Sequence, residues 1–352
     1  MSKNRIEIIK IKLKDLDAFA RVALTDPAFS DITPISRIRA RSQTKNPHGA
    51  PNDLALIVAL YDNRCVGYHG LLPGLLKNIN GYSKIYWLVT FYLNTAFRGK
   101  GYGKRLVIEI QQTNVDLVTT GISASAEGVY KSTGFKQLGE LPYYQLRPES
   151  IHFLDTFLQD LKSTEKQFKS KAVQQLSEEL KPAAAQQAQM VSFQRDIDTI
   201  NWMIRNPWIV SMQEDQRDAE NYYFSTVRDL FKFVPLEIFA TDENTRKGFL
   251  VLSISRKKNK TTIKILDNFF YDPQDSYIVG YFAIKFAKEY LADIIEYPAG
   301  YGNYFRNHTG LKRLEKRKKR LYLFCPRSND SPLASLSGEI QLNYCDSDTA
   351  FT

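Results

Sequence analysis

The sequence predicts an α/β fold, because strand-like and helix-like segments alternate through its first half. Residues 85–93 (IYWLVTFYL) form an apolar run typical of a buried strand, and residues 102–114 have the apolar spacing of a helix. A β-branched run at 115–122 and a strand-like stretch at 137–146 follow. A similar order of segments recurs in the second half, which indicates two copies of one fold.

A glycine-rich loop joins the first of these strands to the helix. Glycine lets the backbone approach an anion closely, and the helix that follows points unpaired N–H groups and the positive end of its dipole at the loop. The sequence therefore predicts a site for a phosphate or pyrophosphate group. The loop residues are Arg98, Gly99, Lys100, Gly101, Tyr102, Gly103 and Lys104.

Two other phosphate-binding loops fit less well. A Walker loop has Ser or Thr after its lysine, whereas Lys104 is followed by Arg105. A dinucleotide fingerprint is Gly-x-Gly-x-x-Gly, whereas the spacing here is Gly99-x-Gly101-x-Gly103. Nucleoside triphosphate hydrolysis and NAD binding are therefore the weaker interpretations.

A second group of residues follows the loop, and the two together resemble the GNAT superfamily of acyl-CoA-dependent N-acyltransferases. The family's loop pattern is Gln/Arg-x-x-Gly-x-Gly/Ala, and its second signature is Asn-x-x-Ala-x-x-x-Tyr-x-x-x-Gly-Phe. The family's asparagine is Ser123 in this sequence. The matching positions are Arg98, Gly101 and Gly103 in the loop, and Ala126, Tyr130, Gly134 and Phe135 in the second signature.

The resemblance implies a mixed central sheet flanked by helices, with acyl-CoA as cosubstrate. It implies that the loop amides hold the CoA pyrophosphate and that the pantetheine lies where strands 86–94 and 115–123 splay apart, beside Ser123. A backbone N–H near Leu93 or Asn94 would stabilise the oxyanion. Tyr130 would protonate the departing thiolate.

The general base is harder to assign, because residues 82–98 contain no Glu or Asp. His69, in the strand-like stretch 65–72, is the candidate that could take a proton from the amine, directly or through water. A histidine in an apolar strand can equally be a structural residue. Asp346 and Asp348, near the C-terminus, are further carboxylates that could bind an amine, but we do not place them in the catalytic set.

The length of 352 residues exceeds one domain of this kind. We expect residues 1–148 to form a GNAT acyltransferase domain with the CoA-binding loop, and residues 149–190 to form a helical linker. Residues 191–352 are expected to form a degenerate GNAT-like domain. The linker prediction is based on apolar residues at mostly helical spacing between 151 and 180, before the polar stretch PAAAQQAQ.

The degenerate domain is predicted from a repeat at an offset of 176 residues. Residues 303–313 echo 128–137, and the offset places 263–270 on the strand before the loop and 277–291 on the helix after it. At the loop itself the second copy reads QDSYIV at 274–279, with an acidic residue, no cation and no glycine. This copy is therefore predicted not to bind CoA. Related tandem arrangements with one working half include Fem-type aminoacyltransferases and N-myristoyltransferases.

Composition limits the other classes of function. The three cysteines and four histidines show no spacing typical of a metal site, so no metal is expected. The net charge of +10 is concentrated at 256–260 and 312–320, but without interleaved aromatic residues these stretches are better explained as solvated connections than as a nucleic-acid site. No signal peptide or apolar run of about 18 residues occurs, so we expect a cytoplasmic protein without integral membrane contact.

Three functional hypotheses follow. The leading one is an N-acyltransferase that moves an acyl group, with acetyl expected, from acyl-CoA to a small amine. The basic loop 34–52, with Arg37, Arg39, Arg41, Lys45 and His48, would suit an anionic acceptor such as an amino sugar. The alternatives are a Fem-like aminoacyltransferase, which would not need a pyrophosphate site, and a non-catalytic CoA-binding protein. A homodimer is one option for assembly.

Overall fold

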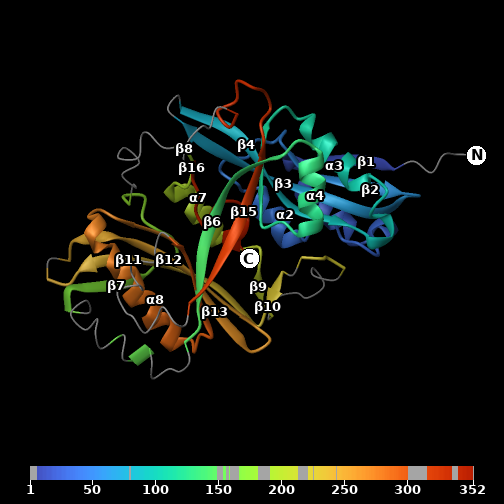
Figure 1. Ribbon diagram of the computed structural model, residues 1–352. Coiled ribbons are helices and arrows are strands. Elements are labelled where there is room, and N and C mark those ends of the chain that lie inside the picture. Colours follow the sequence, from blue (N-terminus) through green and yellow to red (C-terminus); the bar gives the residue numbers. More distant parts are fainter. Residues whose placement is uncertain are drawn as a thin grey trace, which may run out of the picture.

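The fold is described by a computed structural model (Figure 1). It describes residues 6–351 apart from 79–80, 149–153, 156–157, 159–165, 181–190, 213–220, 225, 243, 300–314 and 335–339. No helix of these residues is long and apolar enough to cross a membrane.

The first half of the chain forms one side of a mixed sheet. Its strands are β1 (Glu7–Lys12), β2 (Leu54–Tyr61), β3 (Arg64–Asn78), β4 (Gly81–Leu93), β5 (Asp116–Thr120) and β6 (Lys136–Leu146), and its helices are α1 (Leu16–Ala23), α2 (Arg37–Gln43), α3 (Tyr102–Gln111) and α4 (Ala124–Ser132). Strands β1 to β4 pair antiparallel in chain order, whereas β4 and β5 are parallel. Helix α3 connects this parallel pair, because parallel neighbours need a crossover.

The second half repeats the plan. Its main elements are β11 (Leu230–Ala240), β12 (Arg246–Lys257), β13 (Lys260–Phe270), α8 (Ile278–Glu289), β14 (Ile294–Pro298) and β15 (Glu315–Cys325). Strands β11 to β13 pair antiparallel, whereas β13 and β14 are parallel and are connected by α8. The smaller elements are β7 (Phe168–Ala172), β8 (Val191–Phe193), α7 (Ile197–Arg205), β9 (Val210–Ser211), β10 (Val227–Arg228) and β16 (Ile340–Gln341).

The repeat predicted from the sequence is present in the structure. Helix α8 begins at Ile278, which is 176 residues after α3 begins at Tyr102. The parallel pairing starts at Ile85 with Asp116 in the first half and at Thr262 with Ile294 in the second. The echoed residues Phe305, Gly310 and Leu311 lie outside the described part of the chain. The predicted fold class, two GNAT-like units with mixed sheets flanked by helices, is confirmed.

The two units exchange a strand at their junction. Strand β15 lies between β5 and β6, so a strand from the end of the chain completes the sheet of the first half. Strand β6 in turn pairs with β14 on its other side, from Leu146 with Ile295 to Tyr143 with Pro298. Figure 1 shows the long strands β6 and β15 side by side between the two halves. All described strands except β9 and β10, which pair as a separate two-stranded sheet, therefore belong to one continuous sheet that runs from β1 to β7.

The prediction of a wholly helical linker over 149–190 is wrong where it covers β7. Phe168–Ala172 (FKSKA) is a strand that pairs antiparallel with β11, with Leu236 opposite Ala172. Its alternation places Phe168 inward and the lysines outward, as an edge strand requires. Leu176 and Leu180 then pack into the core that the two halves share, so this stretch is part of the packed structure.

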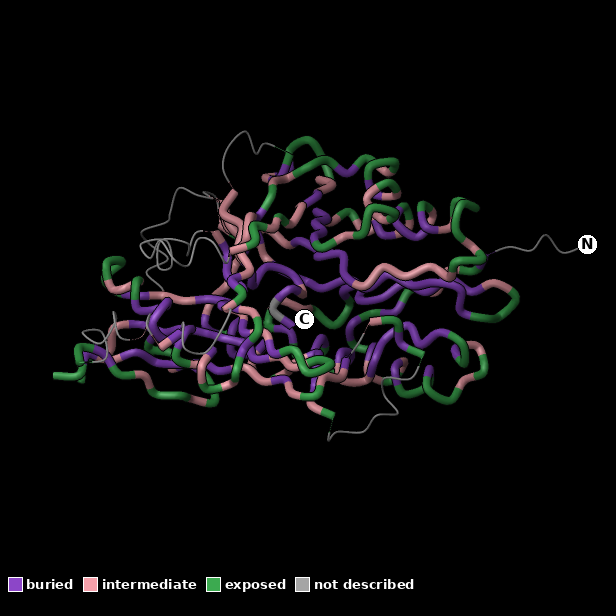
Figure 2. Tube along the Cα trace, turned by 60° about the horizontal axis from the view of Figure 1, so that its bottom comes forward, coloured by how far each residue is buried: buried purple, intermediate pink, exposed green. Residues whose placement is uncertain are grey.

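A shared apolar core holds the two halves together. Trp87 on β4, Phe249 on β12 and Trp202 on α7 belong to one buried cluster. The opposite face of the first sheet packs against α3 and α4, and that of the second sheet packs against α8. Figure 2 shows the buried strands running through both halves, with exposed residues mainly at turns and helix surfaces.

Candidate active site

Strands β4 and β5 separate near the middle of the sheet and border a cleft. They pair from Ile85 with Asp116 to Leu88 with Thr119, after which β5 ends and β4 continues to Leu93. A bulge at Thr90, whose φ is 49°, shifts the register of β4 against β3. The cleft has a volume of about 740 Å³.

The glycine-rich loop lies at one end of this cleft. Gly99 and Gly101 have φ of 76° and 81°, a region that favours glycine, and Gly101 is the N-cap of α3. A Cβ built on either residue meets no atom within 4 Å, so the space beside the loop is open. Gly103 packs closely, since its Cβ would lie 3.1 Å from Phe91 Cζ. These features suit an anion held by backbone N–H groups.

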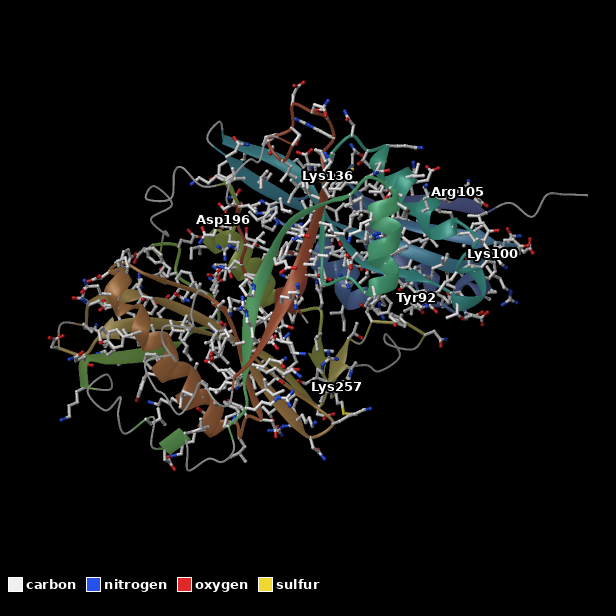
Figure 3. All side chains as sticks on the ribbon, viewed as in Figure 1. Tyr92, Lys100, Arg105, Lys136, Asp196 and Lys257 are labelled. Carbon is white, nitrogen blue, oxygen red and sulfur yellow. The ribbon has the colours of Figure 1, made fainter. Side chains whose placement is uncertain are left out.

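Most of the predicted residues are brought together at the cleft, and several are not. Lys100 Nζ lies over the Phe97 ring, 5.3 Å from its centroid, and Tyr102 packs on the same ring. Figure 3 shows Lys100 and Arg105 far from Lys257, which belongs to the basic hairpin between β12 and β13. The predicted residues that line the cleft are Leu93, Arg98, Gly99, Gly101, Gly103, Lys104, Ser123 and Tyr130.

The expectation that the Asn94 amide stabilises an oxyanion is not supported by the structure. The Asn94 N–H donates to the Val66 carbonyl at 2.8 Å, because the chain is still bound to β3 here. The Asn94 side chain accepts from the Ala96 N–H, which caps a short 3₁₀ turn. Ser123 is the N-cap of α4 and its hydroxyl accepts from the Ala126 N–H at 3.3 Å. Ser123 therefore orders the start of α4 at the edge of the cleft.

Tyr130 and His69 form a buried pair. The Tyr130 hydroxyl lies 2.7 Å from His69 Nε2, while His69 Nδ1 lies 3.2 Å from the Gly70 carbonyl. Because a carbonyl only accepts, Nδ1 carries the proton and Nε2 accepts from the Tyr130 O–H. Burial raises the pKa of Tyr130; a hydrogen bond with Thr119 opposes this rise, and the charge of Asp348 adds to it. Tyr130 is therefore a protonated phenol at neutral pH.

The position of His69 does not favour its predicted role as base for the acceptor amine. Its side chain has no exposed surface, is stacked on Phe91 at 4.8 Å and points at Tyr130. Burial lowers the pKa of His69 to about 4, since the charged ring would lose its hydration. His69 instead orients the Tyr130 hydroxyl.

The low pKa of His69 predicts a pH-dependent stability. Between its ordinary pKa of 6.5 and about 4, the unfolded chain binds a proton at His69 that the folded protein does not bind. The free energy of unfolding should therefore decrease as the pH is lowered through this window, by up to about 1.4 kcal/mol per pH unit. Urea denaturation of the wild type and of His69→Gln measures this. Equal slopes for the two proteins would contradict the assignment; burial also lowers the pKa of His48, but that effect is common to both.

The cleft is also lined by residues that were not predicted from the sequence to lie beside the glycine loop, although Asp348 was named as a carboxylate that could bind an amine. Tyr92, Tyr223 and Phe224 supply aromatic surface, with the first two rings 4.8 Å apart. Arg320 on β15 and Asp348 near the C-terminus supply one charge of each sign. No local spacing connects these segments with the glycine loop, so only the fold could bring them together.

The basic loop 34–52 supplies no lining residue of the cleft, which corrects its expected role in binding an acceptor. Arg39 is buried, with its guanidinium stacked on Trp208 at 3.6 Å and bound to Asp348 at 3.3 Å. Arg41 pairs with Asp17 and His48 contacts Thr199. None of the five basic residues predicted there lines the cleft.

The matching loop of the second half has none of the features of the first. Pro273–Tyr277 is a 3₁₀ turn that runs directly into α8, and the Asp272 side chain accepts a hydrogen bond from the Gln274 N–H. None of the positive φ angles found in the chain falls between residues 272 and 279. An anion would meet side chains and the carboxylate of Asp275 here. Among the described residues, no group of three or more His, Cys, Asp or Glu could hold a metal ion.

Comparisons with known proteins agree with this geometry. Residues 22–135 match the model of the acetyltransferase (GNAT) family, so this part of the chain is a GNAT-type domain. A search of curated proteins found no match.

Solved structures show the same fold over nearly the whole chain. A GCN5-related N-acetyltransferase from Anabaena variabilis aligns with a TM-score of 0.52 and 12% identity, over 92% of this chain and 73% of that one. The N-myristoyltransferase of Saccharomyces cerevisiae with bound myristoyl-CoA aligns with a TM-score of 0.52 and 9% identity. The alignment covers 92% of this chain and 84% of that one. A GCN5-related N-acetyltransferase from Kribbella flavida aligns with a TM-score of 0.50 and 10% identity, over 91% of this chain and 70% of that one. The fold is therefore that of GNAT acyltransferases with two GNAT-like units.

Proposed function

We propose that this protein transfers an acyl group, acetyl in the simplest case, from acyl-CoA to the amine of a small acceptor. The observation that supports this most directly is the cleft between β4 and β5 with the open glycine loop at its end. Arg98 and Lys104 add positive charge there, which suits a pyrophosphate. The remaining length of the cleft leads past Phe91 to Tyr130, where a thioester would be placed.

Tyr130 supplies the acid that the reaction needs. A thiolate leaving group is stabilised when a proton reaches its sulfur, and a phenol with a raised pKa holds that proton until the bond breaks. By rotation about its C–O bond, the Tyr130 O–H can point either at His69 Nε2 or at a sulfur atom in the cleft. His69 thus keeps the phenol in place between turnovers.

The alternatives are less well supported by the site. A Fem-like enzyme that takes its acyl group from aminoacyl-tRNA would have no use for the loop at Gly99 and Gly101, which is fully formed here. The amino sugar proposal depended on the basic loop 34–52, which contributes no residue to the cleft.

The experiment is a thiol-release assay with acetyl-CoA and longer acyl-CoAs against a panel of amines, followed by mass spectrometry of the product. We expect free CoA to form together with an N-acylated amine. Binding of acetyl-CoA without transfer to any amine would favour the non-catalytic CoA-binding protein, and absence of binding would contradict both.

A titration tests the degeneracy of the second half. Calorimetry with acetyl-CoA should give one site per chain, because the turn at Pro273–Tyr277 offers neither open glycines nor cations. The same titration of Gly101→Glu should show no site. A remaining site in that variant would mean that the second unit also binds CoA.

A further inference from the structure

The charges along the cleft divide into two groups. Arg98 and Lys104 belong to the glycine loop, whereas Arg320 and Asp348 come from β15 and from the segment that follows it near the C-terminus; among the described residues, no other charged side chain lines the cleft. The loop end suits phosphate groups, which leaves one cation and one anion for the acceptor. We propose that the acceptor is an α-amino acid, with its amino group at Asp348 and its carboxylate at Arg320; this inference rests on the proposed N-acyltransferase function.

Asp348 is held in place for an amine. One carboxylate oxygen accepts from Arg39 at 3.3 Å, and the other accepts from the Ser347 hydroxyl at 3.2 Å. Arg39 is itself fixed between Trp208 and the Tyr222 hydroxyl, so the carboxylate is anchored from the protein side. Asp348 and Tyr130 line the same cleft, and the negative charge of Asp348 contributes to the raised pKa of Tyr130. Oxygen lone pairs that remain can accept from an ammonium group.

Arg320 is a cation without a carboxylate partner among the described residues. Its guanidinium donates to the Thr349 hydroxyl and lies over the Tyr344 ring at 5.4 Å. No described ion pair joins it to Asp348, although Thr349 is the next residue in the chain. A Cβ at Gly121, which also lines the cleft, would lie 3.8 Å from Arg320 Nη1. A guanidinium in this setting can bind a carboxylate through two parallel hydrogen bonds.

The two charges constrain the acceptor because each one is partly buried. Asp348 keeps its ion pair with Arg39 whichever acceptor binds, but an acceptor without an acidic group would remove water from Arg320 and give its guanidinium no anionic partner, which is unfavourable. The groups are close in space, since Arg320 binds the neighbour of Asp348. An acceptor whose amine and acidic group are only a few bonds apart satisfies both, as an amino acid does.

The reaction balances with these residues. Asp348 accepts one proton from the ammonium group, and the freed amine attacks the thioester carbonyl carbon. The carbon–sulfur bond then breaks, the thiolate takes the proton of Tyr130, and Tyr130 regains a proton from the nitrogen of the intermediate. Asp348 releases its proton to water. The products are an N-acyl amino acid, free CoA and one proton.

The test compares matched acceptors: leucine, leucine amide and isopentylamine, the corresponding phenylalanine set, and glucosamine. With wild-type protein and acetyl-CoA, kcat/KM for the amino acids should exceed that for the amides and amines by about 10²-fold, as expected for one charge-assisted pair. Arg320→Gln should remove this preference by lowering kcat/KM for the amino acids to about the value for the matched amides. The matched control is Lys319→Gln, a neighbouring cation that is exposed and pairs with Glu140.

Asp348→Asn provides a second measurement. It should lower kcat for amino acids and amides alike by about 10²-fold, as expected for loss of a proton acceptor, with unchanged acetyl-CoA affinity. Asp330→Asn, an exposed aspartate outside the cleft, is its control. Equal or better acylation of the amines or of glucosamine would overturn the amino acid proposal and leave the N-acyltransferase function intact. Acetyl-CoA binding without acylation of any compound would overturn both.

Discussion

Gly101→Glu is expected to abolish acetyl-CoA binding. Gly101 is the left-handed N-cap of α3 with φ of 81°, and a side chain there would point into the open space beside the loop. Glutamate would add backbone strain and place a negative charge where the pyrophosphate is expected. Calorimetric titration measures the loss, and circular dichroism establishes that the variant is folded.

The control for this substitution is Gly128→Glu. Gly128 lies on the exposed side of α4, outside the cleft, and also has no atom within 4 Å of a Cβ. It therefore receives the same side chain without approaching the phosphate site, and should bind acetyl-CoA as the wild type does. If folded Gly101→Glu also retained wild-type affinity, the assignment of residues 98–104 as the phosphate site would be wrong.

Tyr130→Phe should reduce turnover by roughly 10²-fold to 10⁴-fold, because it removes only the proton that the thiolate receives. Acetyl-CoA affinity should change little. His69 Nε2 loses its donor, so we expect the free energy of unfolding to fall by about 1–3 kcal/mol. Single-turnover kinetics, in which product release does not limit the rate, measure the effect on chemistry.

Tyr61→Phe is a suitable control for this loss, since Tyr61 packs against Phe97 in the same half of the protein but does not line the cleft. It should turn over as the wild type does. An unchanged single-turnover rate for Tyr130→Phe would show that the phenol is a core residue held by His69, with no part in proton transfer.

The parts of the site that were predicted correctly from the sequence depend on local patterns. The glycine loop, the helix that it caps and the order of strands around it are encoded by neighbouring residues, because turn conformation and apolar period act over short distances. The repeat at 176 residues was detected for the same reason, since both copies keep the same spacing of strand, loop and helix.

The parts that were missed depend on contacts between distant segments. The hydrogen bond between His69 and Tyr130 joins residues 61 apart, and the ion pair between Arg39 and Asp348 joins residues 309 apart. Strand β7 was predicted as helix because the helical spacing of apolar residues was assumed to continue through it. Its pairing with the edge of β11 is a contact between distant segments, which the local sequence does not reveal.

The exchange of strands has a consequence for how this protein is made. Strand β5 hydrogen-bonds to β15 through Thr120 and Leu321, which are 201 residues apart. At synthesis rates of 5–20 residues per second, the first half must wait roughly 10–40 s for the strand that completes its sheet. During this time the edges of β5 and β6 that β15 will fill are open to other chains. A chain released at residue 148 would keep those edges permanently, so we expect it to aggregate, and chaperone demand should fall only once residues 315–325 have left the ribosome.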